Sequence, residues 1–363
     1  MNKLIKIGWW LPILIVAMVI FLVPTKNYWM GDQYSLSHLL EKYNNVEKLK
    51  TIEDGAYYIS PLTWWCIVPI GFKAWSIICG LMYLSLVFYA ARNYGYKWLL
   101  LLILPIIQLF CSYVEVYSLS IVLMLLTYIF YKKEKLALTV IFAALTICAH
   151  VVVGASSIAL AFFFLQKKKG TSFAWFICAG LSLPILYLMF GVFTRENALV
   201  PLIGQYSWLS LAHLMDMVFI FLLNFNWLSG VRNYEISWKE WTYPLAGMGI
   251  AFLINSHLGA VRDWDLFSVS LFPVSLVLID KMKSYNWIGA VPAVIITTLF
   301  LLFNSANRTT EMVGMMSASP QYTVCPRAQR NIIVADVILT NEEHAPVYGQ
   351  YLKWNWEKFH DKR

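Results

Sequence analysis

The chain has 363 residues, of which 60% are hydrophobic, 16% are aromatic and only 13% are charged. Soluble domains carry about 25% charged residues, so this composition predicts a polytopic membrane protein and argues against a soluble enzyme. The net charge of +8 falls in short clusters between apolar segments, which is typical of membrane topology signals and does not form the massed basic face that a nucleic-acid partner would need.

Apolar windows of about 20 residues recur along the chain, and we interpret them as membrane-spanning helices. In chain order these windows are 7–24, 74–91, 97–112, 113–131, 136–149, 151–166, 171–193, 211–228, 243–258, 265–280 and 286–304. The first window could be a signal peptide, but it ends without a small-x-small cleavage site, which favours an uncleaved helix. The predicted fold class is therefore all-α, with about 9–13 transmembrane helices in residues 1–304.

A large first loop is expected at residues 25–73. Within it, Ser35–Asn44 places apolar residues at helical spacing, which predicts an amphipathic helix at the membrane interface. The stretch Ile59–Ile70 is apolar but too broken by proline to span comfortably. Residues 305–363 are expected to form a small polar tail.

The apolar stretch 136–166 is flanked on both sides by lysines, at 132–135 and at 167–169. Both basic flanks are expected on the cytoplasmic side. This demands two short helices or a re-entrant hairpin, with His150 and Gly154 near the turn.

A single threading of the windows groups the basic residues of the short loops on one side, together with Lys3 and Lys6. These are Arg92, Lys97, the two lysine clusters, Arg232, Lys239, Lys281 and Lys283. The positive-inside rule predicts that this side is cytoplasmic. The opposite, external side then receives 25–73, 112–113, His150, 194–210, 259–264 and the tail from 305.

Asp32 is the first candidate for chemistry. A carboxylate just beyond the first helix, at the bilayer surface, could serve as general base on an acceptor hydroxyl. The alternative is that Asp32 caps a helix that begins near Tyr34.

Glu115 and His150 are both expected at the external side. Glu115 could ligate a cation, hold a substrate hydroxyl or pair with an arginine, or it could be a solvated carboxylate in a tight turn. His150 is either a histidine satisfied by a backbone carbonyl or a contact for a phosphate or hydroxyl.

The densest cluster of charges lies between two apolar windows and consists of His257, Arg262, Asp263 and Asp265. Charges beside hydrocarbon usually have a function because each costs about 2.5–3.5 kcal/mol on insertion scales. The Asp-x-Asp spacing can grip a divalent cation, which would neutralise a leaving phosphate, and arginine can bind phosphate bidentately. The alternative is an Arg–Asp pair at a helix end, with an aspartate capping the next helix.

Other motifs add little. Asp216, Asn224 and Asn226 in window 211–228 are weaker candidates. The chain has no Gly-rich phosphate loop, His-Glu-x-x-His or Gly-x-Ser-x-Gly, which argues against a nucleotide-driven pump and a common serine hydrolase. Its six cysteines lack CxxC or CxxH spacing and are interpreted as small buried hydrophobic residues.

With these residues laid out, the chain resembles the C-type membrane glycosyltransferase superfamily (GT-C fold), in a bacterial branch. Asp32 takes the place of the acidic residue in the first external loop of that family. Ser35–Asn44 takes the place of its juxtamembrane helix, and Ile59–Pro69 is similar to the Pro-aromatic stretch that follows. Ser112–Ser118 and Arg262–Ser268 resemble further motifs of bacterial members.

The resemblance implies an inverting transfer of a sugar from a polyprenyl-phosphate donor to an acceptor at the external face of the bacterial inner membrane. Asp32 would be the base, and Glu115, His150, His257, Arg262, Asp263 and Asp265 would bind substrate. No cofactor is implied beyond a divalent cation at Asp263 and Asp265. The chain departs from many members in its single loop acid, Asp32-Gln33, and in its short tail.

Three other functions compete with this interpretation. A transporter or flippase of a lipid-linked saccharide would use intramembrane charges equally well, although two similar halves are not evident. A polysaccharide polymerase would favour a late external loop rich in arginine, whereas the large loop here is early and has none. A purely structural subunit does not account for the charges at 257–265.

Overall fold

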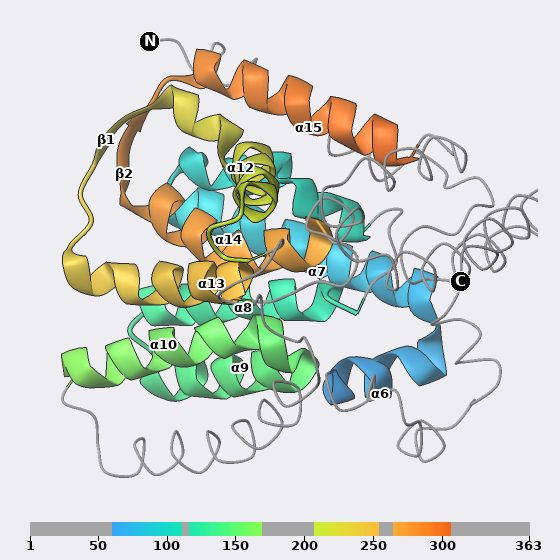
Figure 1. Cartoon of the computed structure of the whole chain (residues 1–363). Coiled ribbons are helices and arrows are strands. Elements are labelled where there is room, and N and C mark those ends of the chain that lie inside the picture. Colours follow the sequence, from blue (N-terminus) through green and yellow to red (C-terminus); the bar gives the residue numbers. More distant parts are fainter. Residues whose placement is uncertain (1–59, 111–115, 169–206, 254–263, 306–363) are drawn as a thin grey trace, which may run out of the picture.

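The computed structural model describes residues 60–110, 116–168, 207–253 and 264–305, and the statements below concern these ranges (Figure 1). They are mostly helical, as predicted. The α-helices are α6 (Pro61–Ile70), α7 (Phe72–Tyr94), α8 (Ser118–Lys132), α9 (Leu136–Ala149), α10 (Val151–Lys168), α12 (Leu211–Phe225), α13 (Thr242–Leu253), α14 (Trp264–Lys281) and α15 (Ala290–Ser305). The 3₁₀ helices are η1 (Tyr96–Ile103), η2 (Pro105–Phe110), η3 (Asn226–Gly230), η4 (Trp238–Trp241) and η5 (Trp287–Gly289).

One helical segment in these ranges, Ala74–Tyr94, is long and apolar enough to cross a membrane by length and composition. The other apolar helices that meet the composition test are shorter, at 10–17 residues. Buried helices of soluble proteins also pass this test, so both the membrane location and the number of crossings stay predictions.

The window 97–112 does not form the single helix that we predicted. It is divided into η1 and η2 at Leu104, whose backbone is extended (φ −75°, ψ 145°). The residue before a proline is driven out of the helical region by the proline ring, and Pro105 follows Leu104. The other described windows each contain one α-helix, with ends shifted by a few residues.

The predicted break in the stretch 136–166 is confirmed. His150 alone separates α9 from α10, with an extended backbone (φ −159°, ψ 111°). The two helices lie side by side (Figure 1). They are in close contact at Gly154, where a Cβ atom would lie 2.6 Å from the carbonyl oxygen of Thr146, so glycine allows the two backbones to meet.

The basic residues gather at one end of the helical bundle, which we call the cationic end. It contains the described side chains of Arg92, Lys97, Lys132, Lys133, Lys135, Arg232, Lys281 and Lys283, which are all the lysines and arginines whose side chains the structure describes. Lys132 pairs with Asp280 across α8 and α14, and Lys281 pairs with Glu240. The predicted grouping of these residues is therefore confirmed, while the membrane and the side of it that they face stay predictions.

Two short strands at this end are absent from the predicted all-α fold. β1 (Val231–Tyr234) pairs antiparallel with β2 (Met282–Tyr285), although both segments were expected as loops. Four residues are too few for a periodic sequence signal, and the pairing joins segments about 50 positions apart in the chain. The ribbon brings the start of α13 and the end of α14 to one place (Figure 1).

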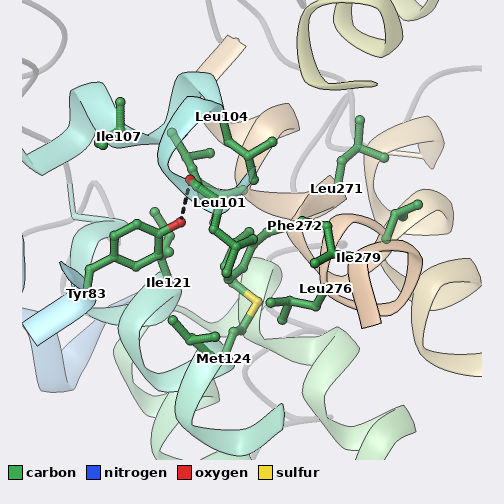
Figure 2. Close-up of a cluster of buried hydrophobic side chains, with 14 of the residues drawn as sticks. Tyr83, Leu101, Leu104, Ile107, Ile121, Met124, Leu271, Phe272, Leu276 and Ile279 are labelled. Carbon is green, nitrogen blue, oxygen red and sulfur yellow. Dashed lines mark hydrogen bonds between the residues drawn. The ribbon is translucent and has the colours of Figure 1, made fainter. Parts of the chain in front are cut away.

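The core forms where η1 and η2 pass between α7, α8 and α14. The Tyr83 hydroxyl donates to the carbonyl oxygen of Leu101 over 2.9 Å, and its ring stacks on Phe110 with centroids 4.8 Å apart. Figure 2 shows Leu101 and Leu104, Met124 of α8, and Leu271, Phe272 and Leu276 of α14 gathered in one buried cluster. Residues 98–110 are all buried, because η1 and η2 are held between these helices.

The end of α8 offers a stability prediction. The amide of Lys135 donates to Phe130 O and that of Glu134 to Tyr131 O, both over 3.0 Å, and Glu134 has φ +57°. This is the Schellman helix ending, which glycine suits best because a Cβ atom costs about 1–2 kcal/mol in the left-handed region. We expect Glu134→Gly to raise the free energy of unfolding by about 1 kcal/mol in denaturant titrations. Glu134→Ala, which removes the same carboxylate and keeps Cβ, is the control and should give no gain.

Candidate functional site

The predicted site residues divide into two groups. Asp32, Glu115, His257, Arg262 and Asp263 lie outside the described residues. His150 and Asp265 are described, and both lie away from the cationic end, at the starts of α10 and α14, whose opposite ends carry the basic residues.

His150 is buried in the turn between α9 and α10, outside both helices. Its Nδ1 accepts a hydrogen bond from the Val153 amide over 3.3 Å, which caps the start of α10. Its ring lies against Tyr117, with centroids 4.8 Å apart. The bond differs from the one predicted: within the described residues the ring accepts from a backbone amide, and no bond to a backbone carbonyl is found.

The capping bond determines how the imidazole can act. An Nδ1 that accepts leaves Nε2 as the protonated nitrogen of the neutral ring. Burial lowers the pKa of His150 to about 3, so the ring is neutral near pH 7. His150 can therefore donate one hydrogen bond but does not supply a positive charge to a phosphate.

This burial predicts a pH-dependent stability. The unfolded chain binds a proton at this ring below its ordinary pKa of 6.5, whereas the folded chain does so only near pH 3. The free energy of unfolding should therefore fall as pH decreases from 6.5 toward 3, by about 1.4 kcal/mol per pH unit. We expect thermal unfolding between pH 7.5 and 5.0 to show a shallower loss for His150→Asn, which keeps a capping oxygen but does not titrate. Equal pH slopes for the two proteins would contradict this account.

Asp265 lies in the first turn of α14 and is 2% exposed. A carboxylate in this position interacts favourably with the helix dipole. One turn further, Ser268 accepts a hydrogen bond from Asn224 Nδ2 of α12 over 2.9 Å. Asn224, a weaker candidate from the sequence, is thus bonded to α14 one helical turn after Asp265.

Asp216 is also buried, at 2% exposure, on α12. The described chain has six carboxylates, and four of them, Glu134, Glu235, Glu240 and Asp280, lie at the cationic end. Asp216 and Asp265 are the two located elsewhere. Burying a carboxylate is costly, so each of these two acids marks its surroundings as a candidate site.

The cationic end contains a network that the sequence did not reveal. The Asp280 carboxylate pairs with Lys132 and accepts a 3.1 Å hydrogen bond from the Tyr128 hydroxyl. Lys97 Nζ donates to the carbonyl oxygens of Asp280 and Met282, the latter over 2.8 Å, and thus caps the end of α14. The sequence did contain a usable signal, because Asp280 is an acidic residue at the end of an apolar window, on the same predicted side as these lysines.

The charges of this network are mutually compensated. Burial lowers the pKa of Lys97, and the nearby Asp280 opposes that shift. For Glu240, burial raises the pKa, but hydrogen bonds from Lys281 and from the Ser237 amide outweigh it and leave the pKa below its ordinary value. We interpret the network as a clamp that holds helix ends together.

Metal binding is unsupported within the described residues, where no group of three or more His, Cys, Asp or Glu side chains could hold an ion. The predicted cation site includes Asp263, which lies outside them, and stays a prediction. Comparison of the chain with protein-family models, with curated proteins and with solved structures gave no match. The resemblance to membrane glycosyltransferases therefore depends on the residues of this chain alone.

Proposed function

We propose that the protein is a membrane glycosyltransferase that transfers a sugar from a polyprenyl-phosphate donor to an acceptor at the end of the bundle opposite the cationic end. One observation carries the proposal, which is the separation of charges along the bundle. All eight described basic side chains lie at one end, while the two carboxylates found elsewhere, Asp216 and Asp265, are buried. This distribution fits a protein oriented in a membrane by its cations, with its chemistry at the other side.

The apolar surface supports a membrane location. Large apolar side chains are exposed in stripes along several helices: Ile77, Leu81 and Phe88 on α7, Leu211, Met215, Val218 and Leu222 on α12, and Val291, Ile295 and Leu299 on α15. Soluble monomers rarely expose contiguous apolar patches of more than a few hundred Å². In this proposal hydrocarbon chains cover these stripes.

The proposed roles follow from the chemistry of a lipid-linked donor. Its phosphate already activates the sugar, so no nucleotide site is needed. Arg262, just before α14, would bind the phosphate, and Asp32 would take the proton of the acceptor hydroxyl. Asp265 and the neutral His150 would position the sugar through hydrogen bonds. A single displacement would invert the anomeric carbon.

The test is sugar transfer by the purified full-length protein in lipid, with a panel of radiolabelled polyprenyl-phosphate sugars. We expect Asp32→Asn to reduce transfer by about 10²–10⁴-fold, as loss of a general base does, and Asp265→Asn to reduce it as well. Glu235→Gln is the matched control, because it removes an exposed carboxylate at the cationic end. It should retain full activity.

Two outcomes would overturn the proposal. Unchanged transfer by folded Asp32→Asn and Asp265→Asn proteins would exclude this site. Movement of labelled lipid between leaflets without consumption of the donor would instead favour a flippase.

A separate test concerns the metal. If EDTA abolishes transfer by the wild type but has no further effect on Asp263→Asn, the predicted Asp-x-Asp motif binds a metal ion.

A further inference from the structure

The ends of α7 and α8 form a corner at the cationic end. Lys133 Nζ lies 4.5 Å from the ring centroid of Tyr89, and Lys132 Nζ lies 5.0 Å from that of Tyr94. Arg92 is exposed one helical turn beyond Tyr89, on the same side of α7. Two cations, Arg92 and Lys133, therefore flank one tyrosine at this corner.

These two cations differ from four of the other six cations at this end in what surrounds them. Lys132, Lys281 and Lys283 each pair with a carboxylate, and Lys97 binds main-chain carbonyls. Among the described residues no carboxylate forms an ion pair with Arg92 or Lys133. A hydrogen bond to Tyr89 is the main cause that raises the pKa of Lys133, so this ammonium group stays charged. The corner thus presents positive charge that no carboxylate among the described residues neutralises.

The position of Lys133 is fixed by the helix ending of α8. Its amide donates to Ile129 O over 3.0 Å, and the next two amides complete the Schellman motif. A fixed main chain reduces the entropy lost when the side chain engages a ligand. The corner is therefore preorganised to bind an anion.

Arg92 also stands at the end of an apolar stripe. Ile77, Leu81 and Phe88 are exposed along α7 and share one side of the helix with Arg92, at successive spacings of four, seven and four residues. From Ile77 to Phe88 the helix rises by about 16 Å, close to half the thickness of a hydrocarbon core of about 30 Å. One leaflet of acyl chain would cover this stripe and bring its phosphate to the level of Arg92.

We propose that Arg92, Tyr89 and Lys133 bind the phosphate headgroup of an anionic phospholipid whose acyl chain lies along the Ile77–Phe88 stripe. The inference relies on the membrane location in the proposed function and does not depend on sugar transfer. A membrane-embedded phosphodiester matches both the unneutralised charge and the adjoining apolar surface, whereas a soluble phosphate would match only the charge.

The experiment measures lipid binding by the purified full-length protein in a neutral detergent, with native mass spectrometry during titration with phosphatidylglycerol or phosphatidylcholine. The test variant is Arg92→Gln with Lys133→Gln. The matched control is Arg232→Gln with Lys283→Gln, which removes the same charge from the same end. Each cation near an anionic headgroup contributes about fivefold in affinity, so the test variant should bind phosphatidylglycerol about 25-fold more weakly, while the control changes less than twofold.

Competition identifies the part of the lipid that is bound. Glycerophosphoglycerol, which lacks acyl chains, should displace phosphatidylglycerol poorly. An equal loss of phosphatidylglycerol affinity in both double variants would mean that only the total positive charge matters, and it would overturn the proposed site. Effective displacement by the soluble headgroup would overturn the role of the α7 stripe. Asp265→Asn should bind phosphatidylglycerol normally, so failure of the glycosyltransferase proposal and failure of this inference are distinguishable.

Discussion

Replacing Gly247 with alanine is expected to lower the free energy of unfolding by about 3 kcal/mol. Gly247 lies where α13 crosses α14, and a Cβ atom there would overlap the carbonyl oxygen of Ser270 and lie 3.3 Å from Cγ of Pro273. A main-chain oxygen cannot rotate away as a side chain can, so the helices must separate. Overpacking a tight contact typically costs about 1–3 kcal/mol, and a main-chain overlap belongs at the upper end.

Gly249, two residues further along α13, is the matched control. A Cβ atom at Gly249 meets no atom within 4 Å. Alanine is favoured over glycine in a helix by about 0.5–1 kcal/mol, so Gly249→Ala should stabilise the protein slightly. Thermal and denaturant unfolding of both variants checks the prediction. It is wrong if the two substitutions change stability in the same direction by similar amounts.

The second large effect is expected at the clamp. Asp280→Asn should destabilise the protein by about 3 kcal/mol, because the Asp280 side chain is only 6% exposed and its loss of charge leaves Lys132 without its partner. The Tyr128 hydroxyl would lose a charged acceptor in the same step. Unfolding in denaturant at neutral pH measures the change.

Glu235→Gln supplies the comparison for the clamp. Glu235 also pairs with a lysine, Lys283, but these side chains are 70% and 54% exposed. Exposed pairs contribute about 0–1 kcal/mol, so this substitution should have little effect. The double variant of Asp280→Asn with Lys132→Met should recover part of the lost stability, since the methionine removes the uncompensated charge. A loss at Asp280 no larger than that at Glu235 would show that the clamp does not hold the helices together.

The apolar windows predicted eight of the nine described α-helices, and the exception is α6 (Pro61–Ile70), which was expected only as a proline-broken stretch of the first loop. The lysine clusters on both sides of 136–166 required a turn, and His150 provides it. The apolar window 97–112 wrongly predicted a single helix. The average hydropathy of a window does not register Pro105, which forces Leu104 out of the helical conformation. The strands at 231–234 and 282–285 could not be predicted, because they depend on a long-range pairing at the end of the bundle.

The candidate site was less accessible to sequence reasoning than the fold. Asp265 was recognised because its charge interrupts an apolar sequence. Asn224 and Asp216 lie inside an apolar window, and only the packing of α12 shows that they are buried, with Asn224 bonded to Ser268. Asp280 was missed because a carboxylate beside a lysine resembles an ordinary solvated helix end, and its partner Lys132 is 148 positions away.

That separation has a consequence for how the protein is made. The ribosome adds about 5–20 residues per second, so Lys132 emerges roughly 7–30 s before Asp280. Throughout that interval Lys132 lacks its carboxylate partner, and Lys97 lacks the main-chain carbonyl groups of Asp280 and Met282 that it later binds. In the proposed membrane location these charges would direct the orientation of α7 and α8 during synthesis, and the arrival of α14 would then convert them into a structural clamp.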